Sequence, residues 1–96
     1  MSNINGILNE REKTHGNVDN VGLVYRLLHK ALYVGKNGND DYSSVQELVL
    51  DAIFMKIARI SCGDANFKDH WIDIVGYATL AVNELEKNEG SENGNK

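Results

Sequence analysis

Apolar side chains recur every three or four residues along most of the chain, and no proline interrupts them. This spacing gathers them on one face of an α-helix, whereas a half-buried β-strand would alternate every second residue. The apolar stripes comprise Ile4, Ile7 and Leu8; Val21, Val24, Tyr25, Leu28 and Leu32; Val45, Leu48, Val49, Ala52, Ile53 and Ile60; and Trp71, Ile74, Val75, Ala78, Ala81, Val82 and Leu85. The sequence therefore predicts an all-α fold, an antiparallel bundle of about four helices.

Turn-forming residues separate the predicted helices. Gly16 is the expected stop of a first helix over residues 3–13, because glycine tolerates the left-handed conformation that ends helices. Candidate N-terminal caps of the later helices are Asn17 or Asp19, Ser43 or Ser44 (with Gln46 or Glu47 completing a capping box), and Asp64 or Asn66. Residues 35–41 read as a loop without the full phosphate-binding glycine pattern. Residues 1–87 then form one domain, and 88–96 a disordered polar tail.

Length and charge bound the classes of partner. A chain of 96 residues lies near the lower limit for a self-sufficient core, so we expect a homo-oligomer, with a dimer as first choice. The net charge of −4 argues against general nucleic-acid binding, which needs a basic surface. Cys62 is the single cysteine, which fits a reducing cytoplasm. No apolar run suits a membrane span or a signal peptide, so a soluble protein is expected.

Two pairs of acidic residues stand out because each pair shares one helical face. Asp69 and Asp73 are one turn apart, and Glu47 and Asp51 repeat the spacing on the preceding helix. Such pairs can reach one cation or one ligand. Asp69 also has a simpler explanation, since an acid in the first turn of a helix stabilises the positive end of the helix dipole.

Basic residues near these acids have two explanations each. Lys56 and Arg59 lie in a helix that is apolar on most sides, so either their stems cover apolar surface and their charges reach water, or they pair with Asp69, Asp73 or a bound phosphate. Arg11, Lys13 and His15 form either a polar helix end or a surface that faces an anionic ligand. Together the acids and bases suggest a nucleotide site.

Three stretches, residues 10–16, 56–60 and 69–78, carry a resemblance to a known group. They resemble small phage-encoded domains of unknown function, which are similar to the nucleotide-modification-associated and MazG-like all-α nucleotide pyrophosphohydrolases. The resemblance covers about residues 5–85. It implies a MazG-like helical bundle, located in the host cytoplasm if the chain is phage-encoded.

The resemblance also implies roles for single residues. In those enzymes, acidic sets on two helices bind magnesium on a nucleoside triphosphate. Asp73 matches the final aspartate and Tyr77 a frequent aromatic residue one turn later, while His70 stands in the place of a glutamate, with Asp69 as the nearest acid. Glu47 and Asp51 approximate the earlier acidic set.

Three functional hypotheses follow. The first is a magnesium-dependent nucleoside triphosphate pyrophosphohydrolase with Asp69 and Asp73 as catalytic residues. Its magnesium ligands would be Glu47, Asp51, Asp69 and Asp73, and its phosphate-binding residues Lys56, Arg59, Arg11, Lys13, His15 and Tyr77. The second is a non-catalytic module that holds a nucleotide, for instance to sequester a host defence signal. The third is a structural oligomer in which the charges only fix the helix register.

Overall fold

The computed structural model describes residues 2–35 and 42–94. It contains the helices α1 (Ser2–His15), α2 (Val18–Val34), α3 (Ser44–Cys62) and α4 (Lys68–Gly94), and no strand among the described residues. The all-helical prediction is confirmed. Most of the predicted loop at 35–41 lies outside the described residues, as do the last two residues of the chain.

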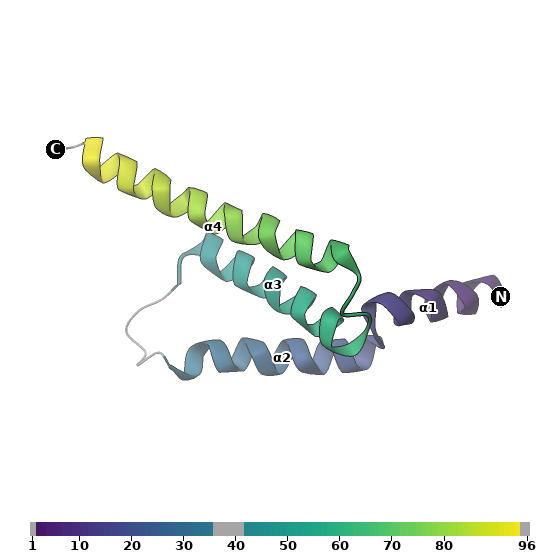
Figure 1. Ribbon diagram of the computed structural model, residues 1–96. Coiled ribbons are helices and arrows are strands. Elements are labelled where there is room, and N and C mark those ends of the chain that lie inside the picture. Colours follow the sequence, from purple (N-terminus) through teal and green to yellow (C-terminus); the bar gives the residue numbers. More distant parts are fainter. Residues whose placement is uncertain (1, 36–41, 95–96) are drawn as a thin grey trace.

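The three helices α2, α3 and α4 pack side by side, with α3 in the middle (Figure 1). α1 projects from one end of this group, where the loop between α3 and α4 also lies. The molecule is consequently elongated, at 63 × 27 × 24 Å. Its radius of gyration of 17.2 Å exceeds the value of about 12.5 Å that a compact chain of this length would have.

Local signals start and stop the helices much as the sequence predicts. The Asn17 side chain caps α2 by accepting hydrogen bonds from the backbone N–H groups of Asp19 and Asn20. Ser43 and Gln46 form the predicted capping box of α3, with bonds of 2.9 and 3.0 Å. Gly16 has a φ of +88°, which confirms the left-handed stop after α1.

The bounds of α4 differ from the prediction at both ends. Asp64 does not cap this helix: its side chain accepts a hydrogen bond from the Asn66 N–H in a turn, and α4 begins only at Lys68. At the other end α4 continues to Gly94, into the segment expected to be a tail. Glutamate and lysine are good helix formers, and no proline stops the helix there.

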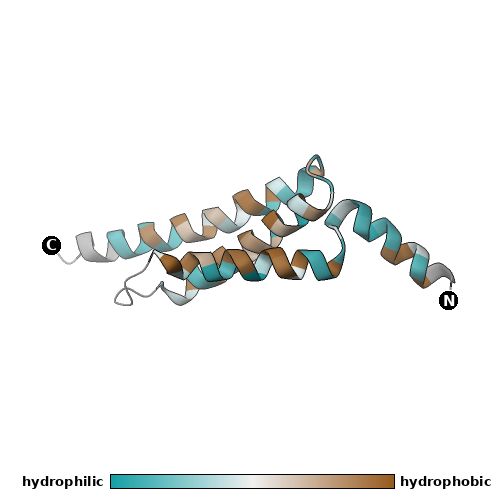
Figure 2. Cartoon of the chain, turned by 90° about the horizontal axis from the view of Figure 1, so that it is seen from below, coloured by the Kyte–Doolittle hydropathy of each residue, from teal (hydrophilic) through white to brown (hydrophobic). Residues whose placement is uncertain are grey.

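The hydrophobic core is thin. Among the described residues only Val21, Val49 and Ala58 are buried hydrophobic residues, and they lie on α2 and α3. Large apolar side chains remain exposed on every helix, and apolar colour recurs along α2 and α4 in Figure 2. No helix in the described ranges combines the length and apolarity that crossing a membrane requires. α3 is the central helix, and most of its side chains between Val49 and Ile60 are at least half-buried, as suits a helix that is apolar on most sides.

Candidate functional site

The end of α1 is attached to the loop before α4 and to the first turn of α4 itself. The backbone carbonyl of Thr14 accepts two hydrogen bonds, from the Asp64 N–H at 3.0 Å and from His70 Nε2 at 3.0 Å. His70 is almost fully buried, with 1% of its surface exposed. Because the carbonyl oxygen can only accept, the Nε2 atom of His70 carries a proton. These contacts hold three separate segments of the chain at one point.

Two glycines make this attachment sterically feasible. A Cβ atom on Gly16 would lie 2.5 Å from the Cβ of Cys62, and one on Gly63 would lie 2.7 Å from the backbone nitrogen of Gly16. Both distances are far below a normal contact, so only glycine fits at either position. Gly63 also ends α3, where its backbone N–H donates a hydrogen bond to the Arg59 carbonyl oxygen. In the structure, the backbone at Gly63 also packs closely against the backbone of Thr14 and Gly16. Local sequence patterns do not predict this contact.

His15 lies in an aromatic cluster next to this attachment. Its ring centroid is 5.8 Å from Phe67 and 5.1 Å from His70, and the rings of Phe67 and His70 are 4.9 Å apart. The Nδ1 atom of His15 is buried without a hydrogen-bond partner among the described residues. Burial lowers the pKa of His15 below its ordinary value, and nearby positive charges, Arg59 foremost, lower it further. His15 is therefore neutral at neutral pH.

Lys56 reaches across from α3 to α4. Its Nζ atom lies 2.8 Å from Oδ2 of Asp73, and the Lys56 side chain is only 15% exposed. This confirms ion pairing over the alternative in which the Lys56 charge reaches water. The hydrogen bond from Lys56 is the main cause that lowers the pKa of Asp73. The Oδ2 atom of Asp73 is thus taken up by an ion pair with Lys56.

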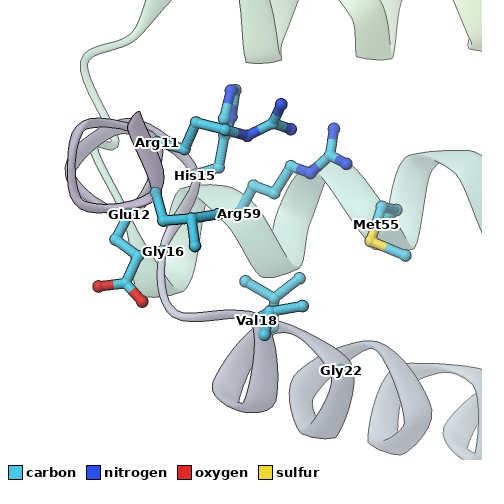
Figure 3. A pocket seen from close by; sticks show the side chains of 10 residues that line it. Arg11, Glu12, His15, Gly16, Val18, Gly22, Met55 and Arg59 are labelled. Atoms are coloured by element: carbon cyan, nitrogen blue, oxygen red, sulfur yellow. The ribbon is translucent and has the colours of Figure 1, made fainter. Parts of the chain in front are cut away.

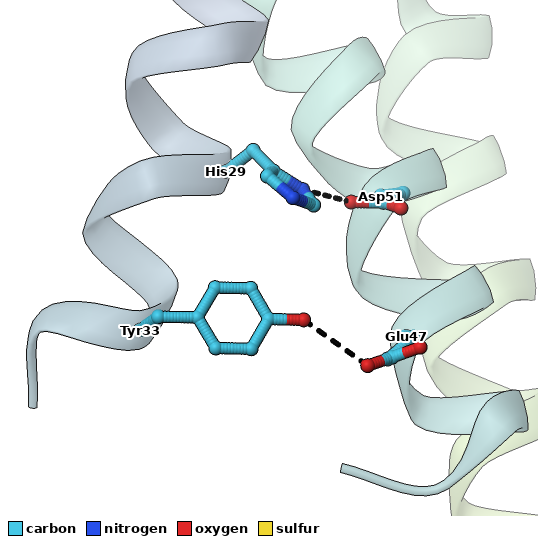
Figure 4. Close-up of polar contacts among 4 residues, drawn as sticks. All are labelled: His29, Tyr33, Glu47 and Asp51. Atoms are coloured by element: carbon cyan, nitrogen blue, oxygen red, sulfur yellow. Dashed lines mark hydrogen bonds and ion pairs between the residues drawn. The ribbon is translucent and has the colours of Figure 1, made fainter. Parts of the chain in front are cut away.

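The acidic pair on α3 faces the opposite neighbour (Figure 4). Oε1 of Glu47 accepts a hydrogen bond from the Tyr33 hydroxyl at 3.1 Å, and Oδ1 of Asp51 lies 2.8 Å from Nδ1 of His29. Both partners belong to α2. Neither contact follows from the sequence, because the four residues belong to two helices whose facing sides depend on packing.

Helical geometry explains why the predicted magnesium ligands do not meet. At 3.6 residues per turn, Lys56 points about 140° around α3 from Asp51. Asp51 therefore faces α2 while Lys56, and with it Asp73, lies on the α4 side. Asp69 is exposed at the start of α4. Within the described residues, no three histidine, cysteine or acidic side chains are grouped as a metal site requires. The structure does not bring Glu47, Asp51, Asp69 and Asp73 to one point in a single chain.

Three of the predicted phosphate-binding residues, Arg11, His15 and Arg59, do come together. Arg11 and Arg59 line a cavity of about 470 Å³ between α1, α2 and α3. Figure 3 shows their guanidinium groups on the same side of the cavity, with the Glu12 carboxylate turned away from both. Glu12 instead accepts a hydrogen bond from the Asn17 side chain at 3.3 Å. In the described part of the chain, neither arginine forms an ion pair.

The remaining walls of the cavity are mostly apolar. They are formed by Leu8, His15, Gly16, Val18, Val21, Gly22 and Met55. Leu8, Val18 and Met55 were not predicted as site residues, because their spacing in the sequence is that of ordinary helix-packing residues. Lys13 and Tyr77, in contrast, do not line the cavity. Lys13 is exposed and pairs with Glu10 at 3.2 Å, and Tyr77 is half-buried on α4.

Comparisons with known proteins return nothing for this chain: no protein-family profile, no curated protein and no solved structure matches it.

Proposed function

We propose that this chain binds a small phosphate-bearing molecule, with a nucleotide as first choice, in the cavity between α1, α2 and α3. The observation that carries the proposal is the pair of guanidinium groups, Arg11 and Arg59, which face the same cavity without an acidic partner among the described residues. Guanidinium groups bind phosphate through charge-assisted hydrogen bonds. Two adjacent positive charges without a counter-ion also repel each other, and an anion between them relieves this repulsion.

The shape and lining of the cavity suit a molecule with an apolar part. Its volume of about 470 Å³ lies within the usual range for small-molecule sites. Leu8, Val18 and Met55 offer apolar contact for a base, while the arginines offer contact for phosphate. Because His15 is neutral, the positive charge of the cavity comes from the two arginines. The resemblance to MazG-like enzymes supports nucleotides as the first class of ligand to test.

The proposal is for binding without hydrolysis. A magnesium-dependent pyrophosphohydrolase needs several carboxylates around one metal ion. Here Asp73 is paired with Lys56, and Asp51 and Glu47 are bonded to α2 on the other side of α3. None of these acids lines the cavity that holds Arg11 and Arg59, which is called the cationic cavity below. We therefore expect that ligand binding persists in the presence of a metal chelator.

Isothermal titration calorimetry with mono-, tri- and cyclic nucleotides and with inorganic phosphate tests the proposal. We expect saturable binding of at least one nucleotide, weakened about tenfold or more by Arg11→Gln and by Arg59→Gln, because each change removes a charge-assisted hydrogen bond. Lys87→Gln, an equal charge change at an exposed position on α4, is the matched control and should bind normally. Binding that is unaffected by both arginine changes, or no heat with any of these ligands, would refute the proposal.

A further inference from the structure

One face of α4 carries apolar side chains that remain largely exposed in the described chain, although the Trp71 indole N–H donates a hydrogen bond to the Ala65 carbonyl oxygen and Ala78 lies at the edge toward α3. We define the α4 seam as Trp71, Val75, Ala78, Val82 and Leu85. The four large members are between 48% and 65% exposed, and Ala78 is exposed as well. Successive members are separated by four, three, four and three residues. This average of 3.5 residues is the period with which two helices pack along a coiled-coil interface.

The contacts of α4 with the rest of the chain use a different face. His70 bonds to Thr14, Asp73 to Lys56 and Glu84 to the Ser43 hydroxyl. These three residues and the seam occupy different positions around the helix, so docking of α4 on α3 leaves most of the seam in contact with water. About half of the apolar surface of the large seam residues therefore stays exposed in the single chain.

The single chain leaves large apolar side chains exposed on every helix. Its buried hydrophobic residues among those described are Val21, Val49 and Ala58, and its radius of gyration is well above that of a compact chain. Contiguous exposed apolar surface on a small protein marks an interaction site. A seam with coiled-coil spacing fits a helix with the same spacing, and α4 itself is such a helix.

We propose that the α4 seams of two copies pack against each other in antiparallel orientation to form a homodimer. The charges at the ends of the seam decide the orientation. Lys68 lies at its N-terminal end, and Glu86 and Glu89 lie at its C-terminal end. A parallel pair would place like charges side by side at both ends. An antiparallel pair centred on Ala78 places the lysine of one copy beside the glutamates of the other and also opposes the helix dipoles.

This inference is independent of the proposed ligand, because no residue of α4 lines the cationic cavity. Sedimentation velocity of the full chain tests the interface. We expect a dimer that Val82→Glu converts to a monomer, since a buried unpaired carboxylate at the seam is costly. Asn83→Glu adds the same charge at the neighbouring exposed position and should leave the dimer intact. A wild-type monomer at all concentrations, or a Val82→Glu dimer, would overturn the proposal.

Distance measurement between spin labels tests the orientation. Glu86→Cys in a Cys62→Ser background places one label per copy at an exposed position beside the seam, next to Leu85, and leaves Glu89 to pair with Lys68. In the antiparallel dimer centred on Ala78, the labelled positions are separated along the helix axis by sixteen residues, or about 24 Å. In a parallel dimer they lie side by side across the interface. A distance of about 24 Å or more supports the proposal, and a short distance of about 10–15 Å, set by the spacing of two packed helices, overturns the antiparallel arrangement.

Discussion

His70 Nε2 lies 3.0 Å from the backbone carbonyl oxygen of Thr14, which is 56 residues earlier in the chain. This hydrogen bond joins the last turn of α1 to the first turn of α4. It is enclosed by Phe67 and His15, whose rings contact the His70 ring. Because α1 has few other contacts with the bundle, the geometry of the cationic cavity depends on this attachment.

The first prediction concerns His70 itself. His70→Ala should lower the free energy of unfolding by about 2–4 kcal/mol, because it removes a buried side chain and a buried hydrogen bond. His70→Gln should lower it less, since the amide keeps an N–H donor. Urea unfolding followed by circular dichroism measures both values. If His70→Ala is as stable as the exposed control Lys87→Ala, the bond to Thr14 contributes nothing to stability.

The second prediction concerns the two glycines at the attachment. Gly63→Ala should destabilise by about 2 kcal/mol or more, because its methyl group would clash with the backbone of Thr14 and Gly16. Gly16→Ala adds the strain of a positive φ to a clash with Cys62. Gly76→Ala is the control: its added methyl group meets only open space within a helix, so it should stabilise by about 0.5–1 kcal/mol. Thermal melts would distinguish the three variants, and equal losses at Gly63 and Gly76 would contradict the close packing.

The third prediction is a pH dependence from His15. Its pKa in the folded chain lies below 6.5, so between these two values the unfolded chain binds more protons. Stability must therefore fall as the pH falls below about 6.5, down to the folded-state pKa. Urea midpoints measured between about pH 7.5 and about pH 5.5 should decrease, and the decrease should be smaller in His15→Gln. An identical pH profile in the variant would exclude His15 as a source.

The pH dependence of Asp73 is separate from that of His15. The pKa of Asp73 is lowered below 3.8 in the folded chain, so its stabilising effect is complete above that value and is lost as the pH falls through the lower folded-state pKa. The two groups therefore act in different pH ranges. A decrease of stability around pH 6 cannot come from this carboxylate.

The fourth prediction separates a structural role of Asp73 from a role in binding or catalysis. Asp73→Asn leaves the Lys56 charge, which is only 15% exposed, without its partner, and should destabilise the fold. Lys56→Met alone should also destabilise. The loss of stability in the double variant should be smaller than the sum of the losses in the two single variants. If the losses simply add, the 2.8 Å ion pair contributes no net interaction.

Ligand binding gives the complementary measurement on the same variant. Asp73 does not line the cationic cavity, so Asp73→Asn should change nucleotide affinity less than about twofold while Arg59→Gln weakens it about tenfold. Calorimetry on both variants measures this contrast. A loss of binding in Asp73→Asn with an unchanged fold would favour a direct role of the carboxylate at the ligand.

The sequence alone determined the helices and several of their ends. Apolar spacing, the Ser43 capping box and the Gly16 stop are local properties, and each acts within about one helical turn. The extension of α4 to Gly94 was not predicted, because a polar helix end has no apolar pattern that distinguishes it from a tail. Arg11 and Arg59 were predicted as phosphate ligands from charge alone. Their position at one cavity agrees with that prediction, although binding itself stays a proposal.

Only the tertiary structure decided which charged groups meet. Helical spacing already separates Lys56 from Asp51 by about 140° around α3, but it does not show which side of α3 receives α2 and which receives α4. Packing placed Asp51 against His29 and Lys56 against Asp73, on different sides of the same helix. The physical reason is that a helix fixes the angles between its own side chains, whereas burial of apolar surface chooses the neighbour that each face receives.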